Sequence, residues 1–120
     1  MEKVQKTKIY DLEKRTLEYG KRIIHLCRSL SKDTINNTIS SQLARSGTSL
    51  GANYREANET VTKKDFSFRM RICRKEGKET VYWLQLLIEA NPDLEKRVAP
   101  LLQETIELVK IFAAIIEKSK

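Results

Sequence analysis

The chain has 120 residues, a net charge of +7 at pH 7 and a pI near 9.5. Hydrophobic residues make up 40% of it and charged residues 32%, with four Gly and two Pro, which excludes a disordered chain and a turn-rich all-β protein. This length predicts a single domain, residues 1–120, around one core. No apolar run approaches the roughly 20 residues of a membrane span or forms a signal peptide, so we expect a cytoplasmic protein without membrane contact.

The first predicted helix covers residues 10–32. Its apolar or small residues follow each other at alternating intervals of four and three from Leu12 to Leu30, and a second such row lies beside them. A stripe of this width is typical of a helix that packs against at least two neighbours. Cys27, on the second row, is expected to be a reduced thiol that packs as a small hydrophobic side chain, and so is Cys73.

The second predicted helix covers residues 34–58, and either Asp33 or Thr34 can cap it. Gly47 and Gly51 stand on one face of this helix, and each costs about 1 kcal/mol relative to Ala in a helix interior. We expect them to allow the close approach of another helix, from the same chain or from another subunit. The alternative is a loop at these glycines that divides the segment into two helices.

The third predicted helix covers residues 62–90, with Thr62 and Asp65 as a capping pair at its start and Asn91 and Pro92 at its end. Its apolar residues repeat at four and three without a break, which is the pattern of a seam in a left-handed bundle. Basic residues gather on the opposite face. A solvated surface is the simplest interpretation of that face.

The fourth predicted helix covers residues 93–118, and Pro100 stands near its start. Proline fits the first turn of a helix but not its interior, so either residues 92–99 form a separate turn or the helix is kinked at Pro100. All connections between the four helices are short, so successive helices should run antiparallel. The predicted fold class is all-α, an antiparallel up-and-down four-helix bundle.

No pattern in the sequence indicates catalysis. His25, the one histidine, has no acid or nucleophile at a spacing that would make a dyad on its own helix, and it is expected to be a partly exposed helical side chain. No phosphate-binding loop or metal-ligand motif occurs. We therefore expect a protein that is not an enzyme and has no cofactor and no metal. A catalytic group assembled between subunits is the alternative that a single chain leaves open.

Polar residues stand close to the apolar rows of the second and third helices. They are predicted to form a structural polar network or a subunit interface: Gln42, Arg45, Gly47, Gly51, Asn53, Arg55, Glu56 and Glu76. Because buried charges need partners, one of the two arginines in this set should pair across helices with Glu76 or Glu56.

Four parts of the chain are informative together: DLEKRTLEYGKRIIHLCRSL at 11–30, QLARSGTSLGANYREA at 42–57, DFSFRMRICRKEGKETVYWLQLL at 65–87 and the apolar fourth helix. On these residues the chain resembles, over nearly its whole length, the four-helix-bundle family of 23S rRNA intervening-sequence proteins. Gly77 departs from the family pattern, in which alanine is expected. The resemblance implies a bundle that assembles into a ring, with a homopentamer as the best expectation. The family is also similar to the accessory variability proteins of diversity-generating retroelements, basic pentameric barrels that bind nucleic acid and a reverse transcriptase.

Charge and resemblance lead to two hypotheses of function. The first is a ring-forming homo-oligomer that binds RNA or DNA mainly through phosphates, with little sequence specificity because Tyr82 and Trp83 are the only adjacent aromatic pair available for stacking. The second is a protein-interaction scaffold or an accessory factor for a reverse transcriptase or another nucleic-acid enzyme. The residues predicted to bind nucleic acid are basic positions of the first and third helices: Lys14, Lys21, Arg22, Arg28, Lys64, Arg71, Arg74, Lys75 and Lys78.

Overall fold

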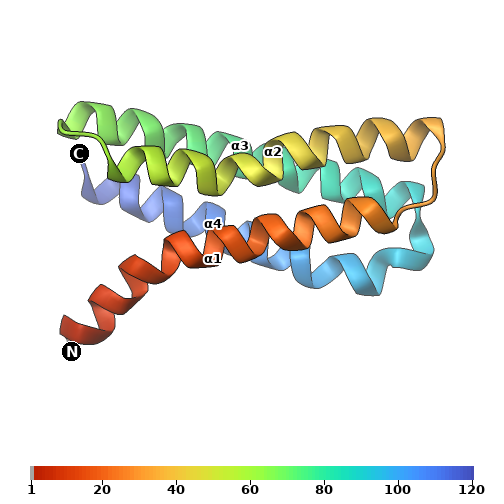
Figure 1. Cartoon of the computed structure of the whole chain (residues 1–120), viewed down its shortest axis with the longest axis horizontal. Coiled ribbons are helices and arrows are strands. Elements are labelled where there is room, and N and C mark those ends of the chain that lie inside the picture. The colour runs from red at the N-terminus through yellow and green to blue at the C-terminus, as the bar shows by residue number, and fades with distance from the viewer. Residues whose placement is uncertain (1) are drawn as a thin grey trace.

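The structure is a computed structural model that describes the backbone of residues 2–120 and the side chains of residues 12–120. The described chain is helical throughout apart from its turns, which confirms the predicted all-α class. Its elements are α1 (Glu2–Ser29), α2 (Thr34–Asn58), α3 (Lys63–Ala90), the short 3₁₀ helix η1 (Pro92–Leu94) and α4 (Glu95–Lys118). Figure 1 shows that successive helices run antiparallel, as the short connections predict.

The four helices share one hydrophobic core, but they are not equally close to one another. α2 packs along α1 and α3, and α3 packs along α4, whereas the backbone of α1 approaches that of α4 only briefly and does not come close to that of α3. The first turns of α1 extend away from the other helices (Figure 1). The largest fully buried side chains come from all four helices and include Tyr19, Ile23, Leu43, Leu50, Met70, Leu84, Leu87, Leu108 and Phe112.

Local signals in the sequence set most of the helix ends. The Asp33 side chain accepts a hydrogen bond from the Asn36 amide at 2.8 Å, and Thr62 Oγ1 accepts one from the Asp65 amide at 3.1 Å, so both predicted caps are present. The predicted bounds of the first helix were wrong. It begins at Glu2 rather than at residue 10, and it ends at Ser29 rather than at residue 32, so residues 30–33 form the connection to α2.

Pro100 lies inside α4, and the separate turn before it is shorter than the predicted 92–99. η1 covers Pro92–Leu94, and α4 then begins at Glu95 and passes through Pro100 as a continuous helix. Pro100 and Lys96, one turn before it, are both exposed, so the carbonyl group that the proline cannot bond lies on the solvent side.

The glycines of α2 lie within one unbroken helix, so the alternative of a loop at this point was wrong. A Cβ on Gly47 would lie 2.8 Å from Ile23 Cγ1, and one on Gly51 would lie 3.1 Å from Thr16 Oγ1. The helix that approaches them is therefore α1 of the same chain. Gly77 of α3 likewise allows α4 to approach closely, because a Cβ there would lie 2.7 Å from Val109 Cγ2.

Candidate nucleic-acid interface

The outward face of α3 carries a row of exposed cations. At 100° per residue, Lys64, Arg71, Lys75 and Lys78 fall within an arc of about 60° on this helix, and all four are exposed. No ion pair engages any of these four side chains within residues 12–120. We call this row, together with the exposed aromatic side chains described next, the α3 stripe.

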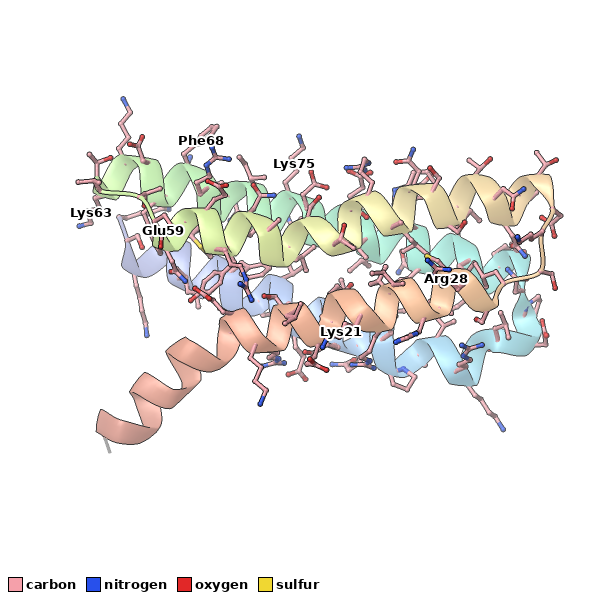
Figure 2. The ribbon with its side chains drawn as sticks, viewed as in Figure 1. Lys21, Arg28, Glu59, Lys63, Phe68 and Lys75 are labelled. Atoms are coloured by element: carbon pink, nitrogen blue, oxygen red, sulfur yellow. The ribbon has the colours of Figure 1, made fainter. Side chains whose placement is uncertain are left out.

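Two aromatic side chains stand in the same row. The Phe68 side chain is 60% exposed and the Tyr82 side chain is 54% exposed, although both types are usually buried. In Figure 2, Phe68 and Lys75 project from the same outer edge of α3. Phe68 was missed in the sequence-based prediction, because the apolar pattern of the helix does not show which aromatic side chains are exposed. The signal that would have found it is its position three residues before Arg71 and seven before Lys75, which places it on their face.

Two acidic residues of α3, Glu76 and Glu79, pair with α2. Arg45 Nη1 donates to Glu76 Oε1 at 3.1 Å, and Arg45 Nη2 also pairs with Glu79. Glu79 Oε2 in turn accepts a hydrogen bond from Trp83 Nε1 at 3.0 Å. The pairing of Arg45 with Glu76 is one of those expected from the sequence, and it leaves the cations of the α3 stripe without competing carboxylates at these two positions.

The other members of the predicted polar network are not all part of this contact. Gln42 belongs to it, because its Oε1 accepts from Arg45 Nε at 3.2 Å. Asn53 instead donates to the Ser49 carbonyl within its own helix at 2.9 Å. Arg55 and Glu56 are exposed, and neither forms an ion pair with any residue in the range 12–120.

Arg74 differs from the other predicted phosphate ligands of α3. Its side chain is half-buried, and its charge acts on Glu117 at the end of α4. A hydrogen bond and the charge of Lys120, with a smaller effect of Arg74, lower the pKa of Glu117. Arg74 therefore lies toward α4, beside the α3 stripe rather than on it.

The predicted cations of α1 form a separate surface. The side chains of Lys14, Lys21, Arg22 and Arg28 are exposed, and Lys21 Nζ pairs with Glu18 Oε2 at 3.0 Å. Because the backbone of α1 does not come close to that of α3, the structure does not join these residues to the α3 stripe. Figure 2 shows Lys21 on α1 far from Phe68 and Lys75.

The α1 surface also differs in the apolar side chains that it exposes. Leu17 and Ile24 are 46% and 42% exposed, and they stand beside the cations of this helix. Another basic residue of α1, Arg15, is held against α4, where its Nε and Nη2 donate to Glu104 at 2.7 and 2.8 Å. This pair was missed, because its members lie 89 positions apart and no local pattern connects them.

A shallow hollow of about 410 Å³ lies at the first turns of α3. It is lined by Lys63, Lys64, Ser67, Phe68, Arg71 and Ser119. Three of these side chains are cationic, and the hollow includes the Phe68 end of the α3 stripe. Phe68 also borders a second depression, which is lined by the carboxylates of Glu56, Glu59 and Asp65 and by one cation, Arg69.

Residues with catalytic or metal-binding potential are dispersed in the part of the chain that is described. His25 is exposed on α1. Burial raises the pKa of the Cys73 thiol to about 12 and raises that of Cys27, so neither thiol ionises readily at neutral pH. Residues 12–120 contain no group of three His, Cys, Asp or Glu side chains placed to hold a metal ion. No described helix combines the length and apolarity that crossing a membrane requires.

The fold and this surface define a class, that of antiparallel four-helix bundles with a basic outer face. The chain matches the family described as 23S rRNA-intervening sequence protein over residues 8–114, and it belongs to that family. This confirms the resemblance seen in the sequence.

A similar solved structure is that of a protein with unknown function from the S23 ribosomal protein family of Bacteroides thetaiotaomicron VPI-5482. It is 32% identical, with a TM-score of 0.78, and the match covers 88% of this chain and 97% of that one. No curated protein matches the chain. The similarity to retroelement accessory proteins stays a prediction.

Proposed function

We propose that this protein binds nucleic acid mainly through phosphates and does not act as an enzyme. The observation that carries the proposal is the row of four exposed cations on α3, free of ion pairs within residues 12–120, while Arg45 occupies the neighbouring carboxylates of Glu76 and Glu79. Unpaired cations in a row release the condensed counterions of a phosphate backbone when they bind it. Such contacts carry no sequence information, so low specificity is expected.

We also propose that the protein works as a homo-oligomer, with a pentameric ring as the form that the resemblance implies. The exposed Leu17 and Ile24 on α1 support a contact between subunits, because clustered apolar side chains on an outer face favour association. Ile24→Asp should then lower the mass measured by light scattering. A single-chain mass for the parent protein would contradict the oligomer and leave phosphate binding to be judged separately.

Binding to labelled RNA and DNA at several salt concentrations tests the main proposal. Four phosphate contacts in each subunit predict that affinity for duplex falls about 100-fold between 50 and 200 mM salt. Arg71→Glu with Lys75→Glu should abolish most binding. Lys96→Glu with Arg97→Glu changes the net charge equally at exposed positions of α4 and is the matched control. Affinity that is flat with salt, or that falls equally in both double variants, would contradict the proposal.

A second candidate function is supported by the α1 surface. Its mixture of exposed aliphatic side chains and cations suits a protein partner such as a reverse transcriptase or another nucleic-acid enzyme. Capture from a lysate treated with nuclease separates this function from the first. A partner that remains after the treatment, and is lost in Leu17→Asp but kept in Arg71→Glu, would favour the scaffold.

A further inference from the structure

We infer that the α3 stripe is a binding track for single-stranded nucleic acid, on which unpaired bases stack against Phe68 and Tyr82 while the cations between them hold the phosphates. This inference rests on the proposed function and adds to it the structural class of the ligand. Neither aromatic ring contributes to the core, since more than half of each side chain is exposed.

The spacing of the α3 stripe suits a linear ligand. Phe68 and Tyr82 are 14 positions apart, which is about 21 Å along a helix, and their directions differ by only about 40°. Arg71, Lys75 and Lys78 lie between them on the same face. Rings at both ends with cations between them match the combination of stacking platforms and basic groove that single strands require.

Tyr82 is held in place by neighbours that the α2 contact fixes. Its ring lies 5.1 Å from the ring of Trp83, edge to face, and the Trp83 indole donates to Glu79. Glu79 is itself paired with Arg45. A ring supported in this way loses little freedom when a base stacks on it, so its contribution to binding is larger than that of a free side chain.

The charges around Phe68 indicate on which side of this ring the strand lies. The hollow on one side has a volume of about 410 Å³, within the range of small-molecule sites, and its cations are Lys63, Lys64 and Arg71. The second depression beside Phe68 carries three carboxylates, including Glu59, and one cation, Arg69, so its net charge is negative. Phosphates are attracted to the first side and repelled from the second, so the strand lies along Lys64 and Arg71.

Duplex nucleic acid cannot use the same rings. Its bases are stacked on each other inside the helix, so it offers the α3 stripe phosphates but no free base face. Unpaired RNA and DNA both offer base faces, and the ring chemistry does not distinguish them. We therefore expect single-stranded RNA and single-stranded DNA to bind more tightly than duplex RNA or duplex DNA.

The test compares three probes of equal length: a single strand with bases, an abasic single strand and a duplex. Phe68→Ala and Tyr82→Ala should each weaken binding of the single strand about fivefold or more and leave the other two probes unchanged. Tyr82→Phe keeps a flat ring and should retain the affinity. Ile35→Ala, which removes an apolar side chain of similar exposure, 59%, from α2, is the matched control.

Trp83, the only tryptophan, gives a second readout. A base that stacks on Tyr82 lies close to the indole, so the single strand should change the Trp83 fluorescence and the abasic strand should not. RNA and DNA versions of each probe show whether the sugar matters.

The outcomes separate this inference from the proposed function. Equal binding of all three probes, unchanged by Phe68→Ala and Tyr82→Ala, would overturn the stacking track while phosphate binding stands. A loss of oligomer mass in these two variants with unchanged affinity would assign the rings to a subunit contact and would also overturn it. Failure of every probe to bind would overturn both this inference and the proposed function.

Discussion

α1 and α3 both present basic outer faces, and the comparison between them shows that charge alone does not describe a surface. α3 exposes aromatic rings in one row with cations that form no ion pair in the range 12–120. α1 instead exposes the aliphatic Leu17 and Ile24 beside cations, one of which, Lys21, is paired with Glu18. Rings and free cations suit nucleic acid; aliphatic side chains suit another protein surface. Under the proposed function, two helices of similar charge would therefore bind different partners.

The largest expected effect comes from breaking the contact that holds α1 to the bundle. Gly51→Leu places a side chain where even a Cβ lies 3.1 Å from Thr16 Oγ1 and 3.5 Å from the Thr16 backbone carbon. We expect a loss of about 3 kcal/mol in the free energy of unfolding, because neither backbone can move apart without opening the core. Urea denaturation measures this loss.

Gly20→Leu is the matched control for that prediction. Gly20 stands on α1 with nothing within 4 Å of an added Cβ, and replacing a helical glycine should raise stability by up to about 1 kcal/mol. Equal destabilisation by both variants would show that a larger side chain costs as much at a glycine with open space as at Gly51, and the account of close packing at Gly51 would be wrong.

The next effect sharpens the comparison of the two outer faces. Lys21→Glu with Arg28→Glu reverses two exposed charges on α1 and should reduce affinity for single-stranded RNA less than threefold. Arg71→Glu with Lys75→Glu reverses two charges on α3 and should reduce it at least about tenfold, since each lost phosphate contact also lowers the salt slope by about one. Fluorescence anisotropy titrations measure both. A larger effect of the α1 pair would show that nucleic acid binds to α1 rather than to α3.

The parts of this molecule that could be predicted from sequence are those that depend on neighbours along the chain. The limits of α2, the caps at Asp33 and Thr62 and the end of α3 before Pro92 all follow from side chains within a few residues of the feature. The close approach at Gly47 was predictable as well, because the cost of glycine in a helix has to be offset by packing.

The parts that could not be predicted depend on which helices become neighbours. Arg15 with Glu104 requires that α1 meets α4, and the separation of the basic residues into two surfaces requires that α1 and α3 do not meet. Periodicity places Phe68 outside the seam but does not say whether another helix covers it. Net charge predicted a polyanionic partner, while the choice of surface needed the tertiary structure.

The inner faces of the two helices should respond to alkaline pH at different points. Burial raises the pKa of Cys73 on α3 from 9.0 to about 12, and burial raises that of Tyr19 on α1 above 10.0 despite its 2.5 Å hydrogen bond with Thr105. Each group stays neutral in the folded chain and ionises first in the unfolded one. Their stabilisation is therefore complete below the unfolded pKa and is lost as pH rises toward the folded value.

Denaturation curves at pH 7.5, 9 and 10.5 measure this loss, which is at most about 1.4 kcal/mol per pH unit for each group. Cys73→Ala should remove the part that begins near pH 9, and Tyr19→Phe should remove the part that begins near pH 10. A stability that is constant to pH 10.5 in the parent protein would show that neither side chain is shielded from water as the structure indicates.

The smallest effect separates local charge from net charge. Arg45→Ala leaves Glu76 and Glu79 without their partner beside the α3 stripe, so affinity for nucleic acid should fall about threefold at low salt, although Arg45 itself touches no ligand. Arg15→Ala removes the same charge but frees Glu104 on the α1 side, and it should leave affinity nearly unchanged. Titrations of both variants at 50 mM salt decide the point. Equal losses would mean that only total charge matters, and the distinction between the two faces would then have no electrostatic basis.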